Sequence, residues 1–202
     1  MMPVMDGLEF CERIKTDQRT SHIPVILLTA RADLSSRIDG LEKGADAYMA
    51  KPFNKEELLV RLRKLLELRQ QLQARYRSHL PIEHTGTIDL TTESANTKAE
   101  GEFLKKFYAL VKENLSDENF EIDQIYRDIG MSRAQLYRKV KALTGDSVGN
   151  IINEIRLEEG RRLLKTTDYN VSEVAFRVGF KDPAYFSRLF SKKFGVPPSS
   201  ML

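Results

Sequence analysis

Hydrophobic side chains near the end of the chain recur with the period of an α-helix. Between residues 183 and 194 they occupy one helical face: Phe186, Leu189, Phe190 and Phe194. Asp182 is a favourable N-cap, Pro183 fits the first helical position, and Gly195 suits the left-handed residue that ends many helices. The pattern predicts a helix that buries its aromatic face and exposes the opposite one.

The same arrangement occurs earlier in the chain. Residues 122–130 match residues 171–179, with apolar residues in corresponding places and a glycine at the end of each segment. Each glycine precedes an apolar residue, a capping residue (Ser132 or Asp182) and a second amphipathic helix. A short helix, a tight turn with glycine and a second helix form a helix-turn-helix, so the sequence predicts two such units.

Two longer helices complete the all-α region that the pattern predicts for residues 102–202. Apolar residues at helical spacing predict a first helix that starts at Glu102 and ends near Leu115. The first recognition helix is expected at residues 132–143. A connecting helix is expected at residues 147–164, between the two helix-turn-helix units.

The first third of the chain has a different pattern. Residues 24–30 form a continuous apolar segment, typical of a strand that is buried on both faces of a parallel sheet, and residues 45–50 predict a second strand. Helices are predicted before, between and after these strands. The order helix, strand, helix, strand, helix is typical of the later part of a doubly wound α/β domain.

A long helix is predicted from Asn54 onward. Its apolar stripe is interrupted by Arg69 and contains Leu58, Leu62, Leu65, Leu72 and Tyr76. Two interpretations stay open: the inward face of the last α/β helix, favoured for residues 54–66, and a dimeric coiled coil, favoured beyond them. Residues 78–101 are rich in Thr, Ser and Asn and predict a linker with little helix.

Composition adds modest constraints. The net charge is +3 over 202 residues, but from Arg127 to the end there are fourteen Lys or Arg against eight Asp or Glu, so the basic excess lies with the repeats. The single cysteine, Cys11, excludes an internal disulfide; we expect it to be buried and the compartment to be reducing. No apolar run has membrane-spanning length, so the sequence predicts a cytoplasmic location, which is compatible with an inner-membrane anchor in the parent protein. The three histidines lack partners at metal-ligand spacing, so no metal site is predicted.

The outward faces of the two predicted recognition helices carry cations and hydrogen-bonding groups. Arginine can bond guanine and glutamine can bond adenine with two hydrogen bonds each, whereas lysines often contact phosphates. The sequence therefore predicts a surface for double-stranded DNA, with Lys193 also near phosphate height. The predicted contact residues are Arg133, Gln135, Arg138, Lys139, Lys181, Tyr185, Arg188 and Lys192.

The paired units, the intervening Ile155-Arg156-Leu157-Glu158 and the ending Gly179-Phe180-Lys181-Asp182 through Pro198 resemble the DNA-binding domain of AraC-type transcription regulators. The resemblance covers residues 102–202. It implies that the two helix-turn-helix units lie at either end of the connecting helix and enter successive major grooves on one face of the duplex.

Residues 1–70 resemble the C-terminal part of a response-regulator receiver domain. The resemblance rests on Met2-Pro3-Val4-Met5-Asp6-Gly7, the strand ending in Thr29-Ala30, and Ala45 through Phe53. It implies that Thr29, Tyr48 and Lys51 are remnants of a phosphorylation switch. In receivers the acceptor aspartate and the acidic pair that holds Mg²⁺ come before this segment, so Asp6 is not the acceptor and no cofactor is expected here. We interpret the sequence as a fragment of a longer regulator.

These observations predict a receiver remnant of flavodoxin-like α/β fold (residues 1–70), a helical stalk and linker (71–101) and an all-α AraC-type domain (102–202). The predicted function is sequence-specific DNA binding as the output of a two-component phosphorelay, of the kind found in hybrid sensor kinases. The alternative is a phosphotransfer or protein-interaction module. We expect no enzymatic activity, because no nucleophile with a base, metal set or phosphate-binding glycine loop occurs. Expected partners are DNA, a second copy bound through the receiver remnant and residues 58–76, and a kinase module upstream in the same polypeptide, but no small-molecule substrate.

Overall fold

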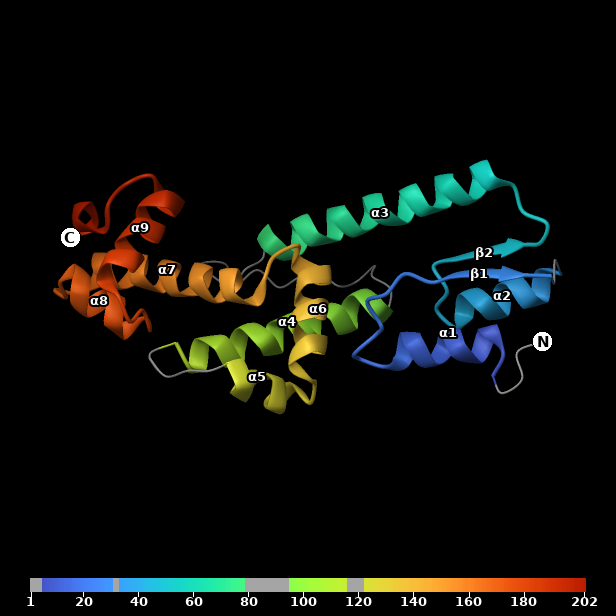
Figure 1. Ribbon diagram of the computed structural model, residues 1–202, viewed down its shortest axis with the longest axis horizontal. Helices are drawn as coiled ribbons and strands as arrows, with labels where there is room; N and C mark the ends of the chain where they lie inside the picture. Colours follow the sequence, from blue (N-terminus) through green and yellow to red (C-terminus); the bar gives the residue numbers. More distant parts are fainter. Residues whose placement is uncertain (1–4, 31–32, 79–94, 116–121) are drawn as a thin grey trace. The chain divides into compact units, whose positions relative to one another are not determined.

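The computed structural model describes residues 5–30, 33–78, 95–115 and 122–202, which form two compact units (Figure 1). The first unit contains α1, β1, α2, β2, α3, the start of α4 and the segment Ala142–Gly145. The second unit contains the rest of α4 and the elements from α5 to the C-terminal 3-10 helix η1. The residues predicted to form the α/β domain thus lie mainly in the first unit, and those predicted to form the two helix-turn-helix units lie mainly in the second.

The first unit is built on a two-stranded parallel sheet. Strand β1 (Ile26–Thr29) pairs with β2 (Ala47–Ala50), and Thr29 lies beside Ala50 at the end of the register. Helix α1 (Gly7–Thr16) packs on β1 and helix α2 (Leu34–Glu42) packs on β2. The predicted order of elements is confirmed. Most side chains of β2 are buried, whereas those of β1 are only partly buried and Leu28 is 40% exposed, so the prediction of burial on both faces is wrong for β1.

Polar contacts hold α1 in this unit. Asp46 Oδ2, just before β2, accepts a hydrogen bond from Lys15 Nζ at 2.6 Å and another from the Val25 amide at 2.7 Å. Asp6 Oδ1 accepts a hydrogen bond from the Glu9 amide at 2.8 Å and so caps α1. Asp6 is therefore the N-cap of this helix. Cys11 is fully buried, as predicted.

Helix α3 (Lys55–Ser78) is continuous and has partners within the chain where the sequence pattern favoured a coiled coil. Tyr76 is buried, and its hydroxyl donates at 3.3 Å to the carbonyl of Thr97 and lies 3.3 Å from Glu100 Oε2. Arg69 Nη1 lies 3.3 Å from Glu100 Oε1 and its Nη2 donates to the carbonyl of His22. Tyr76, which the coiled-coil interpretation placed in an intermolecular seam, is instead covered by residues of α4, so that interpretation is wrong at this position.

Helix α4 (Ala95–Glu113) begins seven residues before the predicted start at Glu102. Residues 95–101 include Asn, Thr and Gly, which favour helix weakly, so the pattern gave no signal there. The contacts of Glu100 with α3 stabilise this first part of the helix, which corrects the expectation of little helix. The rest of the predicted linker, residues 79–94, lies outside the described residues.

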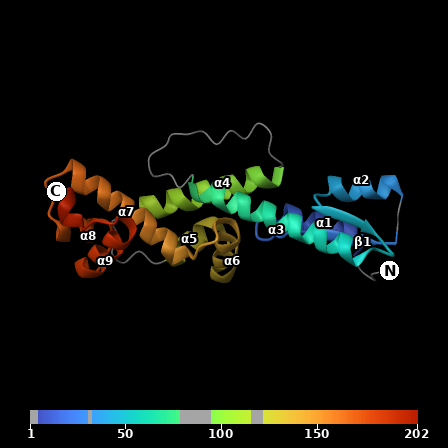
Figure 2. The same ribbon diagram turned by 90° about the horizontal axis from the view of Figure 1, so that it is seen from above.

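The second unit contains both predicted helix-turn-helix arrangements. Its elements after α4 are α5 (Ile122–Ile129), α6 (Arg133–Thr144), α7 (Val148–Thr166), α8 (Val171–Arg177), α9 (Pro183–Phe194) and η1 (Pro198–Met201). Within this unit α7 runs from the α5–α6 pair to the α8–α9 pair (Figures 1 and 2). Gly130 and Gly179 occupy the two turns with φ of 75° and 84°, a conformation that glycine adopts without strain.

Buried aromatic and aliphatic side chains fix the second pair of helices against α7. The cluster consists of Leu157, Leu164, Val174, Ala175, Val178, Phe180, Phe186 and Phe190. Phe186 and Phe190 are fully buried, with ring centroids 5.5 Å apart. The predicted apolar face of α9 is therefore confirmed, and its opposite face is turned away from this core.

Candidate nucleic-acid interface

Helix α9 has the caps that its sequence predicts. Asp182 Oδ1 accepts a hydrogen bond from the Ala184 amide at 2.8 Å, and Pro183 is the first helical residue. Gly195 ends the helix in the left-handed conformation, with its amide donating to the Ser191 carbonyl at 2.9 Å. Because the helix is fixed at both ends and on its aromatic face, the direction of its outward side chains is determined.

Four predicted contact residues lie on the surface at or near α9. Tyr185, Arg188, Lys192 and Lys181 are exposed, and the guanidinium of Arg188 lies 5.8 Å from the centre of the Tyr185 ring. Among the described residues, no ion pair engages Arg188, Lys181 or Lys192. A hydrated cation without a carboxylate partner can bind phosphate or a base edge without first breaking an ion pair.

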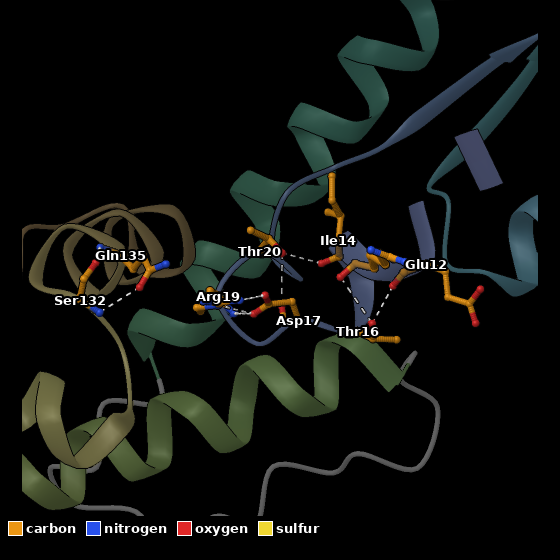
Figure 3. Close-up of polar contacts among 9 residues, drawn as sticks. Glu12, Ile14, Thr16, Asp17, Arg19, Thr20, Ser132 and Gln135 are labelled. Carbon is orange, nitrogen blue, oxygen red and sulfur yellow. Dashed lines mark hydrogen bonds and ion pairs between the residues drawn. The ribbon is translucent and has the colours of Figure 1, made fainter. Parts of the chain in front are cut away.

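Helix α6 begins with a reciprocal cap (Figure 3). The Ser132 amide donates to Gln135 Oε1 at 2.9 Å, and the Gln135 amide donates to Ser132 Oγ at 3.3 Å. This is a capping box with Gln at its fourth position. The side-chain oxygen of Gln135 is thus used inside the protein. Two-point recognition of adenine would require that oxygen to leave the cap.

The two arginines of α6 are exposed and lie close to their own helix. Arg138 Nε donates to the carbonyl of Ala134 at 3.2 Å, and the Arg133 guanidinium lies 5.5 Å from the centre of the Tyr137 ring. A hydrogen bond with the Tyr137 hydroxyl raises the pKa of Arg133. Sequence reasoning missed Tyr137. Its spacing of four residues from Arg133 on a helix was the available signal.

The structure contradicts the outward placement of Lys139. Its side chain is fully buried, and its Nζ lies 4.5 Å from the centre of the Phe103 ring of α4. Lys139 adjoins Val140 and follows Leu136 by three positions, so it lies at the edge of the apolar face, where α4 covers it. The predicted exposure of Lys139 on the outward face of α6 is therefore wrong.

Lys193 also lies differently from the prediction. Its Nζ is 3.1 Å from Glu158 Oε1 and donates to the carbonyl of Glu154 at 3.4 Å, both on α7. The side chain therefore contacts the connecting helix rather than extending to phosphate height. Lys192 lies on the outward face of α9 and Lys193 on the side that faces α7, because successive residues of a helix are rotated about its axis.

The predicted switch residues of the first unit lie in and beside the sheet. Thr29 ends β1, and its carbonyl accepts a hydrogen bond from the amide of Lys51 at 2.6 Å, so these two residues are neighbours. Lys51 is exposed, whereas Tyr48 is buried on β2 against Gly40. Their role in phosphoryl chemistry stays a prediction.

Among the described residues, no group of three or more His, Cys, Asp and Glu side chains could hold a metal ion. None of the helices in the described part of the chain is both long and apolar enough to span a bilayer.

Comparisons with known proteins divide the chain in the same way. A family model of the response regulator receiver domain matches residues 1–63, and a model of the helix-turn-helix domain matches residues 125–202. Histidine kinase P4 of Formosa agariphila is 40% identical over 199 residues, which are 98% of this chain and 14% of that protein. The DNA-binding dual master transcriptional regulator RpaA of Synechocystis is 39% identical over 93 residues, which are 46% of this chain and 38% of that protein.

One solved structure with a similar chain is the C-terminal domain of AraT, a response regulator from Geobacillus stearothermophilus. It is 26% identical with a TM-score of 0.45, and the match covers 48% of this chain and 81% of that one. This chain spans a minor part of the length of the two curated relatives named above. The matched segments give one assignment for each part of the chain: residues 1–63 match the response regulator receiver domain, and residues 125–202, which contain the two glycine-turned helix pairs, match the helix-turn-helix domain.

Proposed function

We propose that this chain is the DNA-reading output of a transcription regulator, with α6 and α9 each entering a major groove. One observation carries the proposal. Two helices of matched sequence are each held by a glycine turn and a buried apolar face, and each presents exposed arginine beside a tyrosine ring. A rigid helix with one polar, cationic face is the element that fits a major groove.

The exposed residues take different roles in this proposal. Arg133, Arg138 and Arg188 read base edges, since a guanidinium can donate two hydrogen bonds to guanine. Lys181 and Lys192 contact phosphates and set the salt dependence of binding. Tyr185 orients Arg188, whose guanidinium lies over its ring.

The receiver segment places the proposed function in a two-component system. The relative from Formosa agariphila is named a histidine kinase, and its match extends over nearly all of this chain. We propose that a kinase module precedes this segment in the same polypeptide, that phosphorylation of an intact receiver with Mg²⁺ controls DNA binding, and that the output acts in the cytoplasm of a membrane-anchored parent protein. The proposal assigns no catalysis, cofactor or small-molecule substrate to the residues of this chain.

A second copy of the chain is the proposed protein partner. Leu59, Leu62 and Leu66 of α3 are 49%, 41% and 62% exposed and recur at helical spacing. The same stripe on two copies forms a self-complementary contact about a twofold axis. Light scattering should show that the parent chain is a dimer. The double variant Leu62→Glu, Leu66→Glu should be a monomer, whereas Lys64→Ala should remain a dimer. A parent chain that is monomeric at high concentration contradicts the dimer.

Selection from a random duplex pool, followed by fluorescence anisotropy over a series of salt concentrations, tests the DNA proposal. Arg188→Ala should weaken binding to the selected site by about 1–3 kcal/mol and relax preference at one or two base pairs. Lys192→Ala should weaken binding to all DNA sequences and reduce the slope of log affinity against log salt concentration by about 1. Arg162→Ala removes an exposed arginine of α7 that pairs with Glu159, and serves as the matched control.

Two results would contradict the proposal. A parent chain that binds no duplex at any salt concentration favours a protein-interaction module. An Arg188→Ala variant that selects the parent's site with the parent's affinity shows that the outward face of α9 does not read bases.

A further inference from the structure

Helices α7 and α9 meet first at a close contact between Gly160 and Phe186. A Cβ atom at position 160 would lie 2.9 Å from Phe186 Cε2 and 3.1 Å from its Cζ. Real Cβ atoms do not approach other atoms so closely, so the ring uses the space that glycine leaves. This contact fixes the separation of the two helices near the middle of α7.

A second contact lies at the last turn of α9 and is ionic. The two carboxylate oxygens of Glu158 lie between two cations, with Oε1 3.1 Å from Lys193 Nζ and Oε2 3.0 Å from Arg161 Nη2. The side chain of Glu158 is 13% exposed. An ion pair shielded to this degree is screened less by water and salt than an exposed pair.

Phe194 lies between the same two cations. Arg161 is 5.1 Å and Lys193 is 5.4 Å from the centre of its ring. Both distances are within the range of cation–π attraction. The carboxylate of Glu158 therefore organises a cluster in which the last turn of α9 is attached to α7.

Two separated contacts restrain α9 more than either contact could alone. Phe186 and Phe190 hold the middle of α9 in the apolar cluster, and the Glu158 cluster adds a restraint at its C-terminal end. The Glu158 cluster therefore contributes to the direction in which Tyr185 and Arg188 project. We infer that Glu158 is a positioning residue for base reading by α9, acting through Lys193 without touching DNA. The inference rests on the proposed DNA binding.

Glu158→Gln removes a negative charge and also removes the proposed positioning contact, and these two changes predict different effects on DNA affinity. Removing one negative charge from a DNA-binding domain should raise affinity for every duplex if electrostatics is the whole effect. Loss of positioning should instead lower the ratio of selected-site affinity to non-specific affinity, by about fivefold for a partly exposed ion pair. Glu159→Gln makes the same charge change one residue later, where the partner is Arg162 of the same helix.

The experiment measures both affinities of the full chain by anisotropy for the parent, Glu158→Gln, Glu159→Gln, Lys193→Met and the Glu158→Gln, Lys193→Met double variant. We expect both single variants of the pair to lower the ratio, the double variant to lower it no further, and Glu159→Gln to leave it unchanged. Equal ratios for the parent and Glu158→Gln overturn the inference even where the parent binds DNA specifically.

Hydrogen exchange supplies a measurement that does not depend on DNA. Glu158→Gln and Lys193→Met should each speed exchange of the amides of residues 191–195 about fivefold, while α8 keeps the exchange rates of the parent. If the amides of residues 191–195 exchange at the parent's rate in both variants, the inference is overturned, whether or not the parent binds any duplex. Lys193→Met keeps most of the apolar stem of the side chain, so it tests the pair from the α9 side if Glu158→Gln does not fold.

Discussion

The two turn glycines provide the sharpest test of how tertiary structure changes the meaning of a repeated sequence. Gly130 and Gly179 occupy the same place in the two helix-turn-helix units and have φ of 75° and 84°. Around Gly130 nothing lies within 4 Å of the position that a Cβ would take. At Gly179 that position is 2.5 Å from the carbonyl oxygen of Leu115 and 2.7 Å from Arg156 Nη2.

The magnitudes follow from these distances. A non-glycine residue in the left-handed region costs about 1–2 kcal/mol, partly offset because alanine restricts the unfolded chain, so Gly130→Ala should cost about 1 kcal/mol. Gly179→Ala is destabilised by the same backbone conformation and, in addition, by an overpacked contact that costs about 1–3 kcal/mol. The neighbouring oxygen is backbone and cannot rotate away as a side chain could. We expect a total of about 2–4 kcal/mol for Gly179→Ala.

Thermal unfolding followed by circular dichroism, with hydrogen exchange of the buried amides of α8 and α9, measures the difference. Gly179→Ala should lower the unfolding temperature of the second unit by about 10–20 °C and Gly130→Ala by about 5 °C, as for a domain of some hundred residues. Gly195→Ala is a second control, because Gly195 has φ of 75° and open space around it. Equal losses at positions 130 and 179 would refute the reasoning from local distances.

Other consequences of the structure can be tested on the same protein. Lys139→Met should keep the parent's affinity for DNA and its salt slope, because the side chain is buried over Phe103 and does not face solvent; anisotropy would detect a reduced slope if this placement is wrong. Cys11 should react with iodoacetamide only on unfolding, since it is fully buried and desolvation raises the pKa of its thiol; rapid labelling of the native chain by mass spectrometry would contradict this. The hydrogen bond from Arg162 lowers the pKa of Glu159, so its contribution to stability is present above the unfolded carboxyl value and is lost as pH falls through the lower folded value. Glu159→Gln should therefore reduce the loss of stability on acidification, which denaturation at a series of pH values would show.

Features that depend on residues close in the sequence could be predicted from the sequence. The caps of α9 at Asp182 and Gly195, the buried face that contains Phe186 and the two short helices before the turns all follow from spacing along a single helix. The order of helices and strands in the first unit was predicted for the same reason. Periodicity and capping are local properties, so the chain encodes them without reference to distant segments.

Tertiary structure decided the features that lie at the borders of those patterns. Lys139 is buried because α4 covers one edge of α6, and α4 itself begins earlier than its weak helix formers predict because Glu100 has partners on α3. Lys193 turns to α7 because Glu158 offers it a shielded carboxylate, which no count of charges along α9 could show. A residue at the edge of a helical face is buried or exposed according to which element packs beside it. That depends on contacts between residues far apart in the sequence, and the period of one helix does not contain them.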